Sequence, residues 1–190
     1  MIGVEIPMTI RQKLYTAEDL GLISRGGNEK VYELVRGELV EVTPSAAIHT
    51  ILASWINYIL TGFVVAHDLG VVTGEIGGYI LFKDPDTVRA PDVGFISKAR
   101  FTSMPESFFP FPPDLAVEIV STGDTASEVD DKVEDYLTSG TRLVWVIYPK
   151  TRKILVYKPG DAVQVVRLDG ADLLPGFSVP AQQIFKPILD

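Results

Sequence analysis

Two carboxylates stand in segments that are otherwise apolar. Glu118 lies within the run Leu115–Val120, and Asp92 opens the apolar run Val93–Ile96. A buried carboxylate is costly unless it is paired or holds a cation, and two of them on neighbouring strands repel each other. A divalent cation that prefers oxygen ligands removes both costs, and Mg²⁺ typically binds one or two carboxylates together with waters and substrate phosphates. The two acids therefore predict a metal site.

Each acid also has a structural interpretation. A carboxylate in an apolar strand can face solvent from the outer side of a half-buried sheet, or it can pair with an arginine. Two acids on successive strands of one sheet favour the metal site more than one acid does. The residues by themselves leave both interpretations open.

Alternating and helical patterns indicate which elements must position these acids. Apolar residues recur at helical spacing from Ile48 to Phe63 and predict a long helix over Ala47–Ala66. A capping box at Thr125–Glu128 opens a second helix that ends at Gly140. Short apolar runs bounded by turn residues predict strands at Gly70–Thr73, Gly78–Phe82, Asp92–Ile96, Leu115–Val120 and Leu143–Tyr148.

The order of these elements predicts an α/β fold whose core runs helix, three strands, helix, strand, with helices on the faces of the sheet. A β-hairpin at Tyr32–Glu41 precedes this core, and a second hairpin built from Lys153–Tyr157 and Val163–Leu168 follows it. A capping box at Thr16–Asp19 adds a short helix near the N-terminus, and a turn-rich tail ends in a short helical piece.

The composition is that of one globular domain. The chain has 190 residues, of which 46% are hydrophobic, so we expect a single domain over 1–190, with its core at about 31–150 and a C-terminal hairpin and tail at 151–190. There is no cysteine, which excludes disulfides, zinc–thiolate sites and thiol nucleophiles. Without a signal-peptide pattern at the N-terminus, we expect a cytoplasmic protein.

Charge is distributed unevenly along the chain. The net charge of −8 disfavours binding to nucleic acid, because contacts with phosphates need Lys and Arg. However, the segment Thr141–Gly160 contains five basic residues and no acid, while Asp124–Asp135 contains six acids and one base. The local field of a groove matters more than the net charge, so a basic surface for phosphate contacts is compatible with this sequence.

One face of the helix predicted at Ala47–Ala66 lacks charge. Its residues opposite the apolar stripe are Ser54, Asn57, Tyr58, Thr61 and Gly62. A solvated helix face usually carries Lys and Glu, so we expect another surface to cover this one. A homodimer is the commonest arrangement, and the chain's own N-terminal segment is the alternative cover.

Several motifs taken together resemble one bacterial family. It is described as putative restriction endonucleases, is expanded in cyanobacteria, was formerly a domain of unknown function, and belongs to the PD-(D/E)XK nuclease superfamily. The resemblance extends from about Tyr32 to Phe185, and each motif alone is weak. The segments that carry it are Tyr32–Val40, Arg89–Val93, Pro113–Ser121, Lys132–Gly140, Val144–Pro149 and Leu174–Phe177.

The resemblance implies roles for particular residues. Asp92 and Glu118 correspond to the metal-binding acids, and the backbone carbonyl of Ile119 would be a third metal ligand. The implied metal is Mg²⁺, with Mn²⁺ as a substitute. The lysine that the superfamily usually has two residues after the acid is absent, because Val120 occupies that position. In some branches this lysine lies on the following helix, which makes Lys132 the candidate.

Simple geometry is compatible with this displaced lysine. Lys132 lies roughly 10 Å beyond the helix cap at Thr125, since each helical residue rises about 1.5 Å. Glu118 lies roughly 10 Å before the strand end at Ser121, since each strand residue rises about 3.3 Å. If the helix folds back over the sheet, the two side chains reach the same level. The alternative is a surface lysine paired with its helical neighbours Glu128 and Asp135.

Two further residues match family positions near the start of the long helix. Glu38 is a candidate because related nucleases use an acid from this region to extend the metal site, and Glu33, Glu41 and Glu75 compete with it. His49 is a candidate base, although a single histidine is more often an ordinary residue at a helix end.

The resemblance implies a Mg²⁺-dependent endodeoxyribonuclease, with Asp92, Glu118, Lys132, Glu38 and His49 as catalytic candidates and double-stranded DNA as substrate. A catalytically inactive module with the nuclease fold, which binds nucleic acid or protein, is the main alternative. The absent lysine at position 120 and the negative net charge favour it. A third hypothesis is a metal hydrolase that acts on a small phosphoester.

Overall fold

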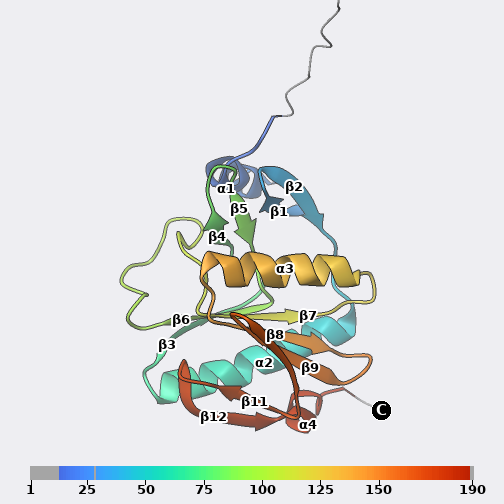
Figure 1. Ribbon diagram of the computed structural model, residues 1–190. Helices are drawn as coiled ribbons and strands as arrows, with labels where there is room; N and C mark the ends of the chain where they lie inside the picture. The colour runs from blue at the N-terminus through green and yellow to red at the C-terminus, as the bar shows by residue number, and fades with distance from the viewer. Residues whose placement is uncertain (1–12, 28, 189–190) are drawn as a thin grey trace, which may run out of the picture.

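Two main β-sheets of unequal size, a further two-stranded sheet and four helices make up the computed structural model, which describes residues 13–27 and 29–188 (Figure 1). The helices are α1 (Ala17–Arg25), α2 (Ala47–Ala66), α3 (Ala126–Ser139) and α4 (Ala181–Ile184). The strands are β1 (Val31–Val35), β2 (Glu38–Val42), β3 (Gly70–Thr73), β4 (Tyr79–Phe82), β5 (Thr87–Arg89), β6 (Val93–Ser97), β7 (Leu115–Ile119), β8 (Leu143–Tyr148), β9 (Lys153–Lys158), β10 (Asp161–Val165), β11 (Arg167–Gly170) and β12 (Leu174–Pro180).

The larger sheet confirms the predicted core. Its strand order is β10-β9-β8-β7-β6-β3, with β7 and β8 parallel and the other neighbours antiparallel. Along the chain the order is α2, then β3, β6 and β7, then α3 and β8, which is the expected helix, three strands, helix, strand. Strand β4 belongs instead to the smaller sheet, where it pairs with the short strand β5 that the sequence analysis did not predict.

Helices cover both faces of the larger sheet. Because side chains alternate along a strand, Leu115, Val117 and Ile119 of β7 face the core that contains α2. Ala116 lies in the opposite core, which contains α3, and the carboxylate of Glu118 is bonded to side chains of α3. Strand β7 is therefore buried on both sides, and Glu118 points toward α3 from the middle of the molecule.

The smaller sheet has the order β2-β1-β5-β4 and includes the predicted N-terminal hairpin. Helix α1 packs on it through Leu20, which lies in one apolar cluster with Leu34 and Val88. The capping box that begins this helix is present, with Thr16 and Asp19 bonded reciprocally. In Figure 1, α3 lies between this sheet and the larger one.

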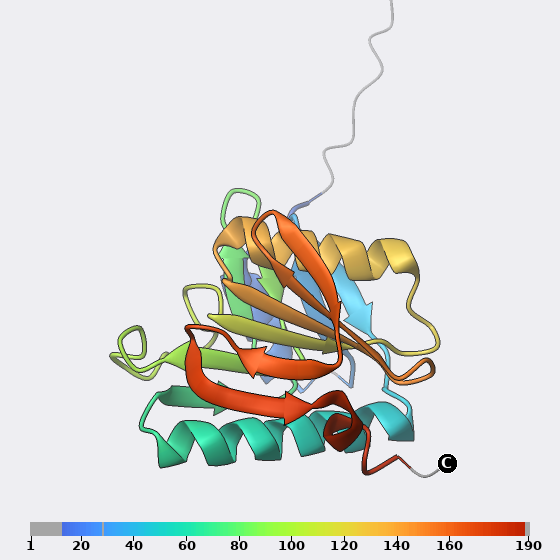
Figure 2. The same cartoon turned by 60° about the horizontal axis from the view of Figure 1, so that its bottom comes forward.

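The C-terminal region partly differs from the prediction. Strands β9 and β10 form the expected hairpin, but the predicted second strand is divided into β10 and β11 around the exposed Val166. Strand β11 pairs with β12, so the turn-rich tail contains a strand, and α4 follows as the expected short helical piece. Leu168 of β11 and Phe177 of β12 are buried in the same core as α2, and Figure 2 shows these two strands beside that helix.

Helix α2 is long and apolar enough to cross a membrane by length and composition. In the structure it packs along β3, β6 and β7, and its residues Leu52, Ile56, Leu60 and Val64 are almost completely buried. The interpretation of this segment as a core helix is therefore confirmed.

Candidate functional site

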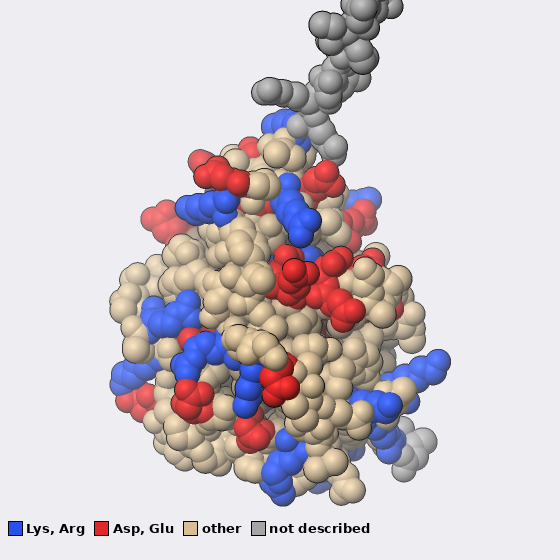
Figure 3. All heavy atoms as spheres, viewed as in Figure 1, with Lys and Arg blue, Asp and Glu red and all other residues tan. Residues whose placement is uncertain are grey.

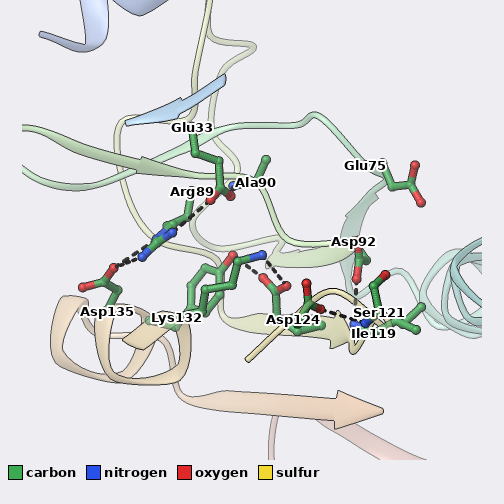
Figure 4. Close-up of polar contacts among 12 residues, drawn as sticks. Glu33, Glu75, Arg89, Ala90, Asp92, Ile119, Ser121, Asp124, Lys132 and Asp135 are labelled. Atoms are coloured by element: carbon green, nitrogen blue, oxygen red, sulfur yellow. Dashed lines mark hydrogen bonds and ion pairs between the residues drawn. The ribbon is translucent and has the colours of Figure 1, made fainter. Parts of the chain in front are cut away.

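Asp92 lies beside the end of β7. The register that pairs Val93 with Val117 brings Asp92, one residue earlier, alongside Glu118. One oxygen of Asp92, Oδ2, accepts a hydrogen bond of 2.7 Å from the backbone N–H of Ile119 (Figure 4). In an extended strand the N–H and C=O of one residue point to the same side, so the carbonyl of Ile119 faces the same side as Asp92.

The carboxylate of Glu118 is buried, with 7% of the residue exposed. Its Oε2 accepts a hydrogen bond of 2.9 Å from Nζ of Lys132, and its Oε1 accepts one of 2.8 Å from the hydroxyl of Tyr136. Burial raises the pKa of Glu118 to about 7; the charge of Lys132 opposes this rise and the charge of Asp92 adds to it. The solvent-facing alternative is therefore wrong for this acid.

Lys132 reaches Glu118 from α3, as the helix geometry predicts. The negative charge of Glu118 raises the pKa of the Lys132 ammonium, although burial opposes the shift. The surface pairs that formed the alternative are absent among the described residues. Glu128 instead caps α3 at Thr125, and Asp135 binds Arg89.

Tyr136 is a site residue that the sequence analysis missed as a functional candidate. It follows Lys132 by four residues, so both side chains lie on the same face of α3. It is fully buried, and its hydroxyl donates to Glu118. Val120, which stands where the superfamily's usual lysine would be, packs in the apolar core on the same side of β7. The only signal for Tyr136 was its spacing from Lys132.

His49 lies in the first turn of α2 and is buried. Its Nε2 is 3.1 Å from Oδ2 of Asp92, and its Nδ1 is 3.6 Å from Oε1 of Glu75. Burial by itself lowers the pKa of His49, but the hydrogen bond to Asp92 and the charges of Asp92, Glu75 and Glu118 raise it overall. The structure thus brings His49 to Asp92, together with Glu75.

Glu38 is not brought to this cluster. It is exposed at the start of β2, opposite Val35. The buried acid of the same hairpin is Glu33, whose Oε1 accepts a hydrogen bond of 2.9 Å from the backbone N–H of Ala90. Because Ala90 is two residues before Asp92, Glu33 and not Glu38 contacts the segment that carries Asp92.

Arg89 is buried between two acids and is not available for contacts with phosphates. Its Nη1 donates to Glu33 at 3.0 Å, and its Nε and Nη2 donate to Asp135 at 3.0 and 2.7 Å. We call these three residues the ion triad. The ion triad joins the smaller sheet to α3, and Figure 4 shows it beside Lys132.

The donors around Asp92 fit a divalent cation. Asp92, Glu75 and His49 offer ligand atoms that all lie within 4.8 Å of one another. Among the described residues, Nδ1 of His49 is buried without a hydrogen-bond partner. We call Asp92, Glu118, Glu75 and His49 the acid cluster. Of its three carboxylates only that of Glu118 is bonded to an ammonium group, that of Lys132, and this excess of negative charge suits a bound metal ion.

Charged side chains also mark the surface near the site. Acidic side chains gather over α3 (Figure 3), whose exposed residues include Glu128, Asp130, Asp131 and Glu134. Basic side chains lie near the turn between β8 and β9, where Lys150 and Lys153 are exposed. Strand β8 runs parallel to β7 and pairs Ile147 with Ile119. The turn that follows β8 therefore lies at the same end of the sheet as the C-terminal end of β7.

Comparisons with known proteins identify a family and a shared fold. The family Uma2, described as putative restriction endonuclease, matches residues 17–182. A crystal structure of a putative nuclease belonging to DUF820, from Anabaena variabilis, superposes with a TM-score of 0.78 over 92% of this chain and 99% of that chain, at 16% sequence identity. This likeness shows a shared fold. No curated protein matches the chain significantly.

Proposed function

The chain belongs to the Uma2 family of putative restriction endonucleases, and we propose that it is a metal-dependent endonuclease that hydrolyses phosphodiester bonds in DNA. One observation supports this proposal above the others. Two acids on neighbouring strands, Asp92 and Glu118, lie side by side in an apolar environment, and Lys132 is bonded to one of them. The two acids can bind a metal ion, and the ammonium group of Lys132 can interact with a phosphate.

Asp92, Glu118 and the carbonyl of Ile119 would hold Mg²⁺, for which Mn²⁺ would substitute. Both hydrogen bonds that Asp92 accepts among the described residues involve Oδ2, which leaves Oδ1 for a cation. When bound, the ion supplies Lewis acidity, which polarises the scissile phosphate and lowers the pKa of a coordinated water.

The chain's own side chains prepare the site for this chemistry. Lys132 is held at the site by its bond to Glu118, and its ammonium offsets the negative charge that builds up on the reacting phosphate. Tyr136 fixes the other oxygen of Glu118, and His49 fixes the orientation of Asp92. We therefore assign Lys132 a catalytic role, and we assign Tyr136 and His49 positioning roles.

DNA would reach the site at the end of the sheet where β7 and β8 end. The exposed Lys150 and Lys153 lie at this end and can contact backbone phosphates. The acidic surface of α3 repels phosphates, so we expect the duplex to avoid that face. We also place the protein in the cytoplasm, where its lack of cysteine is no disadvantage.

A homodimer would place two such sites on one duplex. The exposed residues Ile51, Ser54, Tyr58 and Val65 form an uncharged strip along α2. Helix α4 covers part of this helix, where Nε1 of Trp55 donates to the carbonyl of Gln183 at 2.9 Å. The alternative cover, the N-terminal segment 1–12, lies outside the described residues. Sedimentation at tens of micromolar should show a dimer that Tyr58→Glu dissociates; a monomeric parent protein would contradict the dimer.

Cleavage assays with Mg²⁺ or Mn²⁺ on plasmid, single-stranded DNA and RNA test the activity, with Asp92→Ala as the inactive control. We expect nicking of plasmid that requires metal and is absent in the variant. Binding of DNA without cleavage at any metal concentration would favour the catalytically inactive binding module, which the absent lysine at position 120 supports. Hydrolysis of a chromogenic phosphodiester without cleavage of DNA would indicate a small-molecule hydrolase.

A further inference from the structure

We propose that Ile76 is a substrate-binding residue, whose apolar side chain packs against the sugars and bases of DNA beside the scissile phosphate. The residue lies in the loop between β3 and β4 and directly follows Glu75 of the acid cluster. The proposal rests on the proposed function, because it names a part of the molecule that meets the DNA next to the metal site.

The backbone of Ile76 has a conformation that its side chain disfavours. Its φ is 71°, and among the described residues that have positive φ and are not glycine it is the only β-branched one. This region is sterically costly for such a side chain, and an outlier of this kind suggests a function. The N–H of Gly77 donates to the carbonyl of Gly74 at 3.4 Å, so Ile76 is the third residue of a turn that favours glycine at this position. The chain therefore keeps a bulky side chain where stability alone would favour glycine.

The core of the protein does not compensate this strain. Ile76 is 69% exposed and belongs to none of the three apolar clusters of buried residues in the described part of the chain. A ligand that covers the side chain would compensate it, because covering removes apolar surface from water.

The loop of Ile76 lies at the end of the larger sheet that carries the acid cluster. Strands β3 and β6 are antiparallel neighbours, so the loop after β3 begins beside the segment of Asp92. Ligand atoms of Glu75 and Asp92 lie within 4.8 Å of each other, and in Figure 4 both residues lie on one side of Lys132, with the ion triad on the other. Successive Cα atoms are about 3.8 Å apart, so a phosphate bound at the acid cluster brings its own sugar and base within reach of Ile76.

Both ends of the loop are fixed to neighbouring segments. The side-chain amide of Asn57, from α2, donates a hydrogen bond of 3.0 Å to the carbonyl of Thr73. At the other end, the N–H of Phe109 donates one of 3.0 Å to the carbonyl of Gly78. The loop therefore holds Ile76 in place without contacts from the side chain itself, and such preorganisation lowers the cost of binding a ligand.

DNA offers an apolar surface that suits this side chain. Proteins place apolar side chains, isoleucine among them, against base edges and base steps in the grooves. The other groups that we assign to DNA at this end of the sheet, the metal site and the exposed Lys150 and Lys153, act on phosphates. Ile76 adds a contact that involves no charge, so its contribution to affinity does not depend on the release of counterions.

Thermal melting of two variants separates this role from a structural one. Glycine adopts positive φ without a steric cost, so Ile76→Gly should melt at or above the temperature of the parent protein. Ile76→Leu keeps an apolar side chain without a branch at Cβ and should be at least as stable as the parent protein. A clearly lower melting temperature of Ile76→Gly would show that the residue supports the fold and would overturn the proposal.

Cleavage kinetics with Mg²⁺, and anisotropy of a fluorescent duplex in a chelating buffer, test the contact with DNA. Ile76→Gly should raise both KM and Kd by about tenfold or more, the size expected for one apolar side chain that is no longer buried. Its kcat should stay within about threefold of the parent value, because the contact is made equally in the ground state and the transition state. The slope of log affinity against log salt should not change, because no charge is removed.

Two controls accompany this variant. Ile76→Leu should bind and cleave DNA like the parent protein, because the apolar contact remains. Met104→Ala should also leave KM and Kd unchanged. Met104 is 78% exposed, but it lies in the loop that follows β6, and this strand leads away from Asp92.

The outcomes distinguish this proposal from the nuclease proposal. Parent-like KM and Kd in Ile76→Gly, an equal loss in Ile76→Leu or Met104→Ala, or a lowered salt slope would overturn the role of Ile76. A parent protein that binds the duplex without cleaving it would overturn only the nuclease proposal, because the ratio of the Kd values still tests Ile76. A parent protein that does not bind DNA would overturn both.

Discussion

The ion triad and the acid cluster lie next to each other, and they differ in how their charge is compensated. In the triad, Arg89 donates three hydrogen bonds to Glu33 and Asp135, and Glu33 accepts a fourth from the backbone of Ala90. In the acid cluster, only Glu118 of the three carboxylates is bonded to an ammonium group, that of Lys132, and one imidazole nitrogen has no hydrogen-bond partner among the described residues.

This difference shows how a structural ion network can be told from a site that needs a ligand. Burial raises the pKa of Glu118 to about 7, against the attraction of Lys132, so the ionised acid cluster is unfavourable without a cation. In the triad the two carboxylates raise the pKa of Arg89 despite the opposing effect of burial. The triad therefore holds the helix that carries Lys132 against the segment that carries Asp92, while the acid cluster is the site that we propose for a metal ion.

The largest expected effect comes from breaking the triad. Arg89→Ala leaves Glu33 and Asp135 buried without their cation, and such a change typically costs about 3–5 kcal/mol. Urea unfolding should show this loss in the midpoint, with Mg²⁺ unable to restore it. Arg142→Ala removes an exposed pair with Asp172 and serves as the matched control, with an expected change of about 0–1 kcal/mol. Equal stability of the two variants would show that the triad is dispensable.

A smaller effect should appear in the pH dependence of the metal-free protein. Glu118 has a higher pKa in the folded protein than its ordinary value of 4.5, so the folded state binds more protons than the unfolded state between about pH 4.5 and 7. The free energy of unfolding should therefore fall as the pH rises through this window. The raised pKa of His49 acts in the same direction above pH 6.5.

Thermal melting in a chelating buffer measures this slope. Glu118→Gln should flatten the part below pH 6.5, and addition of Mg²⁺ to the parent protein should raise its melting temperature most at the upper end of the range. A parent protein that becomes more stable from pH 5 to 7 in chelator would contradict the account of Glu118.

The smallest effect concerns the basic turn. Lys150→Ala and Lys153→Ala should each weaken DNA binding for all sequences and lower the slope of log affinity against log salt by about 1. Lys98→Ala is the control. Lys98 follows the C-terminal end of β6, whereas Asp92 precedes the start of that strand, and Lys98 pairs with Asp68. Fluorescence anisotropy at several salt concentrations measures the slopes. A loss in Lys98→Ala that matches the other two would show that the basic turn has no special role.

The sequence predicted the parts of the site that depend on local patterns. The positions of Asp92 and Glu118 follow from two apolar strands, and the approach of Lys132 follows from the lengths of one strand and one helix. The order of core elements also follows from periodicity, and the larger sheet confirms it. The two acids and the element order needed no knowledge of how distant segments pack, whereas Lys132 became a candidate through the family resemblance and on the assumption that its helix folds back over the sheet.

The remaining parts depend on packing between sheets. Both faces of β1 are covered, with Leu34 against α1 and Glu33 against Arg89, so alternation could not show which acid of the hairpin is buried. Glu38 was favoured because it matches a family position, and the structure leaves it exposed. The triad was missed because it joins two sheets and a helix, and β5, which carries Arg89, has only three residues.

Metal binding and cleavage measured in parallel on Lys132→Ala test the central claim most directly, with Asp92→Asn as the reference. Calorimetry should show that Lys132→Ala binds Mg²⁺ within a few-fold of the parent protein, because Asp92, Glu118 and Ile119 remain. Plasmid cleavage by the same variant should fall by at least about a hundredfold, the size expected when one preorganised charge is removed from the transition state. Asp92→Asn should lose both Mg²⁺ binding and plasmid cleavage. Cleavage by Lys132→Ala at the parent rate, or Mg²⁺ binding unchanged in Asp92→Asn, would contradict the account.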